Sequence, residues 1–242
     1  MLLLYSEAPV LMAINEGSAK RLLNPESVGQ GLMIGLSRLC MVFVTALLLG
    51  CTQKHPVSLS SDIPPPPVAK TNVQARVAVF FKESMRSYRH HVDAIRLLND
   101  FHSYDFEIGP TLCNALLRSV NNAYSSVAEI SRPASPGDYP LVIVFSLQKS
   151  QIDVSFEERL TPSARAYSLF AVSVDVFNGK TMVPLHNSTL NGRAFLIRAL
   201  GKVSSREAEK VFAAAIESSI QQLASNAVAL FAQWAEEPSP KQ

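Results

Sequence analysis

The sequence carries little net charge and few cysteines. Its 242 residues include 22 Lys and Arg against 20 Asp and Glu, and the net charge of +2 gives no electrostatic reason to expect a nucleic acid partner. Cys40, Cys51 and Cys113 lack the C-x-x-C spacing of zinc sites and do not indicate a disulfide framework. With 48% hydrophobic residues the chain is too apolar for a disordered protein, so the composition indicates one globular domain with additional segments.

Residues 39–49 form a short apolar run that follows Arg38. As a helix this run spans about 16 Å, which suits a signal-peptide core better than a transmembrane helix. The sequence Leu48-Leu49-Gly50-Cys51 resembles the lipobox of bacterial lipoproteins. This resemblance implies cleavage between Gly50 and Cys51 and a covalent N-acyl and S-diacylglycerol lipid on Cys51, with no other cofactor. The alternative, a buried core helix, is disfavoured by the polar, proline-rich stretch that follows.

The apolar run lies far from Met1, whereas signal peptides begin close to the initiator methionine. Met33 is a better start, because the residues up to Arg38 then form a short n-region with one positive charge. We therefore interpret residues 1–32 as a wrongly assigned start or a leader, and residues 33–50 as the lipoprotein signal peptide.

Thr52 follows the lipobox cysteine. In lipoproteins, Asp at this position favours retention in the inner membrane, so the resemblance implies the periplasmic face of the outer membrane. The three acyl chains usual on such cysteines anchor a protein effectively permanently.

Residues 51–73 include prolines 64–67 and show no apolar periodicity. Consecutive prolines favour the stiff polyproline II conformation, so we expect a lipidated tether that holds the domain off the bilayer. A ligand for a proline-recognition domain is the alternative. Residues 74–236 are then a single periplasmic domain, and residues 237–242 are a disordered tail.

The first half of the domain gives mixed secondary-structure signals. A strand is expected at residues 75–81, and apolar residues at helical spacing allow a short helix within residues 88–101. Gly109-Pro110 opens a clearer helix, because proline is favoured in the first helical turn. A short strand is expected at residues 127–130.

The second half has stronger signals. Long strands are expected at residues 141–156, 166–177 and 182–195, with Asn178-Gly179 as the hairpin turn. Ser204 and Glu207 form a capping box that opens a helix over residues 204–234. The predicted fold class is α+β: a mostly antiparallel β-sheet with two helices packed on one face.

This order of elements, together with the lipobox, the hairpin and the Ala-rich terminal helix, resembles small bacterial outer-membrane lipoproteins. These are the YajG type and, more distantly, the lipopolysaccharide-assembly lipoprotein LptE. The LptE-like resemblance implies a partner of an outer-membrane β-barrel that also contacts lipopolysaccharide, whereas the YajG type implies no defined activity. Residues 82–104 are an additional segment that such compact domains do not need.

Few residue patterns indicate catalysis. Ser146-Leu-Gln-Lys149 matches the S-x-x-K pattern of acyl-transferring serine enzymes, but residues three apart on a strand face opposite sides, and that chemistry needs a helix. Cys113 and His102 together suggest a thiol protease. The alternative, that Cys113 is simply buried in the core, is favoured because free cysteine is often buried. We therefore predict no catalytic residues and a protein that is not an enzyme.

Residues 86–96 concentrate positive charge. Adjacent His90 and His91 diverge on any regular element, so no metal site is predicted. The alternatives for the segment are a solvated face and a contact with an anionic partner, such as lipid A phosphates or an acidic protein surface. The candidate contact residues are Arg86, Arg89, His90, His91 and Arg96.

Two hypotheses for function follow. The first is a membrane-anchored, non-enzymatic accessory or assembly factor for an outer-membrane or envelope complex, which docks its envelope protein partner through a sheet edge or through residues 82–104. The second is a lipid- or glycan-binding periplasmic module that uses a groove between the helices and the sheet.

Overall fold

The computed structural model describes residues 52–60, 63, 73–97, 100–157, 161–201 and 204–236. The chain divides into two units, residues 1–49 and residues 50–242, and every described residue belongs to the second. The expected leader, signal peptide, Gly50, Cys51, prolines 64–67 and tail lie outside the described residues. In chain order the elements are β1 (Gln53–Val57), β2 (Val73–Phe81), α2 (Glu83–Arg86), β3 (Arg89–Leu97), β4 (Asp100–Glu107), α3 (Gly109–Ala123), β5 (Tyr124–Ile130), β6 (Leu141–Glu157), β7 (Ser163–Asn178), β8 (Pro184–Ala199) and α4 (Ser205–Glu236).

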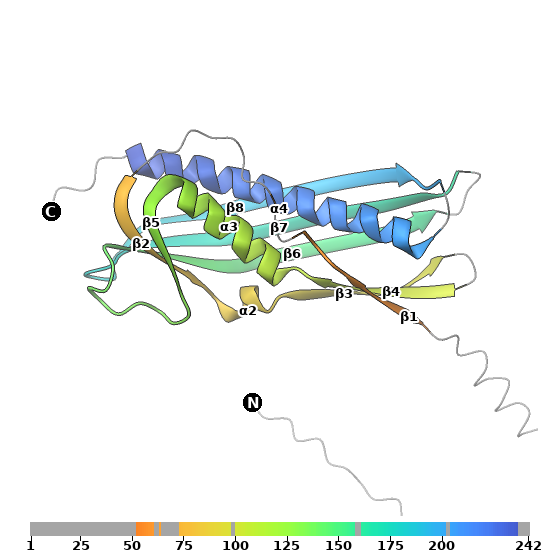
Figure 1. Ribbon diagram of the computed structural model, residues 1–242, viewed down its shortest axis with the longest axis horizontal. Coiled ribbons are helices and arrows are strands. Elements are labelled where there is room, and N and C mark those ends of the chain that lie inside the picture. The colour runs from red at the N-terminus through yellow and green to blue at the C-terminus, as the bar shows by residue number, and fades with distance from the viewer. Residues whose placement is uncertain are drawn as a thin grey trace, which may run out of the picture. The chain divides into compact units, whose positions relative to one another are not determined.

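The strands form two sheets (Figure 1). One has five strands in the order β5-β2-β6-β7-β8, and the other has three in the order β1-β4-β3. The predicted α+β class and the antiparallel meander of β6, β7 and β8 are confirmed. The sheets are mixed, however, because β2 is parallel to both β5 and β6, and β1 is parallel to β4. Parallel pairing is possible here because long crossover segments separate these strands in the chain.

Residues 88–101 lie mostly in a β-hairpin and do not form the short helix that their apolar spacing allowed. β3 and β4 pair antiparallel, and their register shifts between Val92 and Ile95. A bulge inserts an extra residue into a strand, so residues three apart can lie on the same side. Val92 and Ile95 accordingly both pack against the core.

The single-turn helix α2 lies between the two sheets in the chain, and the start of α3 packs against it. The backbone N–H groups of Ile108 and Gly109 donate to the Tyr88 carbonyl oxygen at 3.1 and 2.9 Å. A side chain at Gly109 would place its Cβ 2.1 Å from the Arg86 carbonyl oxygen. Glycine is therefore required for this close approach of α3 to α2.

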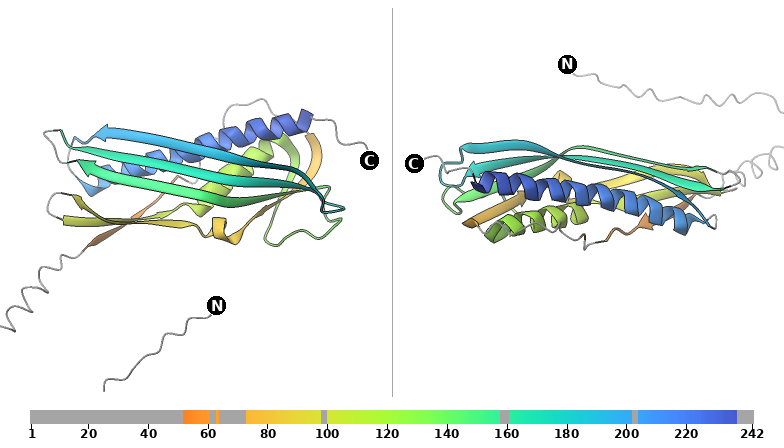
Figure 2. Two further views of the ribbon diagram at one scale, coloured as in Figure 1. Left: turned by 180° about the vertical axis from the view of Figure 1, so that it is seen from behind. Right: turned by 90° about the horizontal axis from the view of Figure 1, so that it is seen from above.

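α3 and α4 lie on one face of the five-stranded sheet (Figures 1 and 2), as predicted. The Glu207 N–H donates to Ser204 Oγ at 3.3 Å, so the predicted cap of α4 is present. No helix in the described ranges has the length and hydropathy needed to cross a membrane. The buried core between helices and sheet includes Val77, Val79, Leu112, Leu116, Ile143, Phe145, Phe170, Val172, Phe212, Ile216, Ile220 and Leu223.

The predicted hairpin at Asn178-Gly179 joins β7 and β8. Asn178 Oδ1 accepts the N–H groups of Lys180 and Thr181 at 2.9 and 3.3 Å, and the non-glycine Met182 has a positive φ of 55°. The connection is longer than a two-residue turn, because β8 begins only at Pro184.

β8 is an edge strand, and α4 covers part of its free edge. The Arg193 N–H donates to Gln222 Oε1 at 2.7 Å, and Asn226 Nδ2 donates to the Asn191 carbonyl oxygen at 2.8 Å. Gly192, between these two residues, is buried under the helix. Side chains of α4 thus hydrogen-bond to β8 backbone groups that would otherwise be open to pairing with another chain.

The expected tether over residues 51–73 is partly a strand of the domain. β1 pairs with β4 from Gln53 opposite His102 to Val57 opposite Phe106, and Val57 belongs to the buried core. Beyond β1, the Ser60 N–H donates to Glu217 Oε1 on α4 at 2.7 Å. Local composition did not reveal this packing, because β1 is stabilised by partners far away in the sequence.

Candidate functional site

A polar cluster lies where β1, β4 and α4 meet. His55 Nε2 of β1 lies 2.9 Å from His102 Nδ1 of β4, and His55 Nδ1 lies 3.0 Å from Glu209 Oε1 of α4. The His55 ring also stacks on Tyr104, with ring centroids 5.4 Å apart. A chain of hydrogen-bonding groups therefore runs from a carboxylate through two imidazoles.

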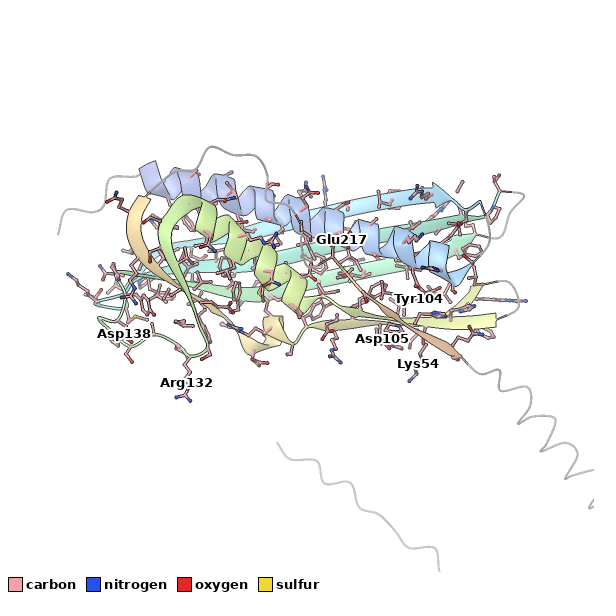
Figure 3. All side chains as sticks on the ribbon, in the orientation of Figure 1. Lys54, Tyr104, Asp105, Arg132, Asp138 and Glu217 are labelled. Carbon is pink, nitrogen blue, oxygen red and sulfur yellow. The ribbon has the colours of Figure 1, made fainter. Side chains whose placement is uncertain are left out.

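The two β4 members of this cluster are buried. His102 is 6% exposed and Tyr104 is 2% exposed, and the Tyr104 ring meets Phe212 of α4 edge-on at 5.2 Å. Burial, with a smaller contribution from Glu209, raises the pKa of Tyr104 to about 12, so its phenol is neutral at ordinary pH. Figure 3 shows Tyr104 between β4 and α4, and Lys54 on the outer side of β1.

This arrangement attaches β1 to the domain. The described residues contain no group of three or more His, Cys, Asp or Glu side chains positioned to hold a metal ion. The cluster instead gives each imidazole nitrogen of His55 a partner, one on α4 and one on β4. Its evident role is to hold in place the strand that follows Cys51.

The structure does not bring the five predicted cationic residues into one surface. Arg86 Nη2 lies 2.6 Å from Glu129 Oε1, and the same guanidinium donates to the Phe81 and Ile130 carbonyl oxygens at 3.3 Å. Arg86 is thus part of the packing between α2 and β5. Glu129 thus compensates the charge of Arg86, and a contact of Arg86 with an anionic partner stays a prediction.

The neighbouring basic residues lie on β3. Arg89 and His91 lie on its exposed face, where Arg89 pairs with Glu107 at 2.8 Å and His91 Nδ1 lies 2.6 Å from Asp105 Oδ1. His90 lies on the opposite face, and burial lowers its pKa, so this imidazole is neutral at pH 7.

Cross-strand carboxylates therefore compensate much of the expected positive charge. Arg96 lies apart from these pairs, near the hairpin end and opposite Phe101. An anionic contact through Arg96 stays a prediction.

The residues of the two candidate catalytic patterns lie on strands and on a buried face of a helix. Ser146 and Lys149 lie on strand β6, and a register irregularity falls between Leu147 and Lys149. Cys113 is buried in α3, and burial raises its thiol pKa to about 12. A neutral thiol is a poor nucleophile, which disfavours the thiol-protease hypothesis.

The expected groove between the helices and the sheet is filled by core side chains. A cavity of about 590 Å³ lies instead beside β1, against β3, β4 and the start of α3. Its lining combines apolar and charged groups: Pro56, Val57, Ser58, Leu59, Arg89, Asp105, Phe106, Glu107, Pro110 and Thr111.

No protein-family model matches the sequence, and no curated protein matches it. Among solved structures, a DUF330 protein from Xanthomonas campestris matches with 12% identity and a TM-score of 0.43, over 77% of this chain and 100% of that one. A minor lipoprotein from Acinetobacter baumannii matches with 7% identity and a TM-score of 0.35, over 69% of this chain and 94% of that one. A hypothetical protein from Chlamydia trachomatis matches with 14% identity and a TM-score of 0.37, over 69% of this chain and 100% of that one. With TM-scores below 0.5, these similarities carry no argument about the present chain.

Proposed function

We propose that this chain is a lipoprotein anchored through Cys51 to the periplasmic face of the outer membrane, where it serves as a non-enzymatic accessory factor of an envelope complex. One observation carries the proposal. β1 begins at Gln53, two residues after the lipobox cysteine, and is built into the domain. A lipid on Cys51 then fastens the folded domain itself to the membrane.

The geometry of the candidate catalytic residues supports a non-enzymatic role. Cys113 is buried with a raised pKa, and Ser146 is buried on a strand. The partner we propose is an envelope protein, with an outer-membrane β-barrel as the candidate and lipopolysaccharide as an additional contact. Because α4 occupies the middle of the β8 edge, the outer faces of the sheets offer more room for docking.

The cavity beside β1 favours lipid or glycan binding as a second candidate function. Its apolar residues suit an acyl or sugar-ring surface, and Arg89, Asp105 and Glu107 in its lining offer polar contacts. A ligand there would touch the strand that follows the anchor.

Labelling cells with radioactive palmitate tests the anchor. We expect label in the wild-type protein and in Cys113→Ser, and none in Cys51→Ser. Label that persists in Cys51→Ser would refute the proposed anchor.

Extraction in mild detergent, followed by identification of bound proteins and lipids, tests the accessory role. A stoichiometric envelope protein supports the first function. A stoichiometric lipid or glycan without a protein partner contradicts it and supports the second.

A further inference from the structure

We infer that one end of the domain, termed here the anchor end, lies directly on an anionic bilayer surface. The anchor end consists of the start of β1 at Gln53, the hairpin end of β3 and β4 with Phe101, the end of β8 with Ile197, and the start of α4 at Ser205. The inference rests on the proposed lipidation of Cys51 and goes further by assigning the domain's orientation and its lipid contacts.

The direction of β1 determines where Cys51 lies relative to the domain. Because β1 is parallel to β4 and Gln53 lies opposite His102, the start of β1 lies beside the hairpin end of β4. Cys51 precedes Gln53 by two residues, and two residues of extended chain span at most about 7 Å. A lipid on Cys51 must therefore enter the bilayer close to Phe101.

Several other elements begin or end at this same end of the domain. Figures 1 and 2 show the hairpin end of β3 and β4, the C-terminal end of β8 and the start of α4 at the same end of the domain. Within the five-stranded sheet, the register places the last residue of β8, Ala199, opposite Ser163, and Ser163 opposite Glu157 at the end of β6.

Exposed apolar side chains are concentrated toward the anchor end. The described residues include four exposed large hydrophobic side chains: Phe101 at 46%, Val183 at 55%, Phe195 at 61% and Ile197 at 53%. Phe101 and Ile197 lie at the anchor end, and Phe195 lies two residues before Ile197 on the same strand face. Only Val183, in the connection between β7 and β8, lies at the opposite end.

Basic side chains also lie at the anchor end. Lys54 is exposed one residue beyond the start of β1, and Arg198 is exposed beside Ile197. A cavity of about 260 Å³ next to Ile197 is lined by Arg198 and Lys210 together with one acidic residue, Glu207. Glu157, an acidic residue of the same end, is paired with Arg165 at 2.8 Å.

These features fit a bilayer better than a protein partner. Apolar side chains among basic residues suit the boundary between headgroups and acyl chains, where apolar burial and attraction to anionic lipids add together. The anchor holds this end within a few ångströms of that boundary. Phe101 and Ile197 then enter the boundary, while Lys54 and Arg198 contact anionic headgroups.

Tryptophan quenching in vesicles tests the orientation. The only tryptophan is Trp234, so Trp234→Phe provides a background without intrinsic tryptophan emission. In that background, lipidated Phe101→Trp, Ile197→Trp and the matched control Val183→Trp are reconstituted into phosphatidylethanolamine and phosphatidylglycerol vesicles with brominated or unmodified acyl chains. We expect brominated chains to quench emission from Phe101→Trp and Ile197→Trp, and to leave Val183→Trp unchanged.

Several results would overturn the inference. Quenching of Val183→Trp alone reverses the orientation, equal quenching of all three variants means no preferred end, and quenching of none means that the domain stands off the bilayer. Adding Lys54→Glu and Arg198→Glu should reduce quenching of Phe101→Trp, and no reduction would contradict the headgroup contacts. Mass spectrometry of each variant first establishes whether Cys51 is lipidated. A missing lipid counts against the proposed function. Quenching in a pattern other than the expected one, on lipidated protein, counts against the orientation alone.

Discussion

At Gly192, α4 lies close against β8, and we expect Gly192→Ala to destabilise the domain. A Cβ at this position would lie 2.0 Å from the Ser219 carbonyl oxygen and 2.7 Å from Leu223 Cβ. The carbonyl belongs to the helix backbone, so no change of side-chain rotamer relieves the contact. Either α4 or β8 must shift.

The size of the effect follows from two opposing contributions. Inserting a methyl group into a packed interface costs about 1 to 3 kcal/mol. Replacing glycine by alanine also lowers the conformational entropy of the unfolded chain, which stabilises the folded state by only about 0.4 to 1 kcal/mol. Steric overlap with backbone dominates, and we expect a net loss of about 1 to 2 kcal/mol, which corresponds to a fall in Tm of about 2 to 8 °C for a domain of this size.

Gly201→Ala is the matched control. A Cβ at Gly201 meets no atom within 4 Å. The same substitution there should therefore be neutral or raise stability by about 0.4 to 1 kcal/mol through the unfolded state.

Thermal melts followed by circular dichroism measure both variants. Hydrogen exchange at the Arg193 amide gives a local readout, because a shift of α4 weakens its hydrogen bond to Gln222. If Gly192→Ala melts at or above the wild-type temperature, α4 does not lie on β8 at this position and the reasoning fails.

Three further predictions concern single side chains. In urea denaturation, Arg86→Ala should lower the free energy of unfolding by about 1 to 3 kcal/mol, because it leaves the Ile130 carbonyl and the Glu129 carboxylate without this partner. Arg89→Ala, at an exposed pair, should lower it by at most about 1 kcal/mol. Equal losses would contradict the placement of Arg86 in the packing between α2 and β5. Ser168→Ala should cost about 1 to 3 kcal/mol in the same assay, since its fully buried hydroxyl lies 2.8 Å from the Ala215 carbonyl oxygen of α4. Burial raises the pKa of Cys113 from 9.0 to about 12, so the stability that the neutral thiol contributes is present below pH 9 and is lost as pH rises through 12. The melting temperatures of the wild type and Cys113→Ala should therefore converge or cross over that pH range. Iodoacetamide should leave the folded thiol unmodified at neutral pH.

Patterns that depend on neighbouring residues predicted the structure well. The capping box at Ser204, the proline after Gly109 and the Asn178-Gly179 turn each describe a local interaction, and each lies where the sequence indicated. The same holds for the long meander, whose strands are indicated by apolar runs and, in the second half of β6, by alternation at Ile152, Val154 and Phe156.

Predictions failed where distant contacts decide the conformation. The spacing of Val92 and Ile95 fits a helical turn as well as a bulged strand, and only pairing with β4 selects the strand. Likewise, the cluster of basic residues in the sequence gives no sign that Glu107 pairs with Arg89 or that Glu129 pairs with Arg86. The polar cluster of His55 was missed for the same reason, because His102 and Glu209 belong to other elements.

The position of β1 changes what the proline run does. Three contacts hold the chain before that run: β1 pairs with β4, Ser60 donates to Glu217, and Arg118 Nη1 donates to the Ile63 carbonyl oxygen at 3.4 Å. Prolines 64–67 follow all three in the sequence, so they belong to the connection between Ile63 and β2. A proline run at this point of the sequence joins two parts of the domain, so it would not separate the domain from a lipid on Cys51. For a lipid on Cys51, as proposed, the distance between lipid and fold is set by Thr52 and by the attachment of β1. We therefore expect a change at His55, which fastens β1, to affect membrane orientation more than a change at any of these prolines.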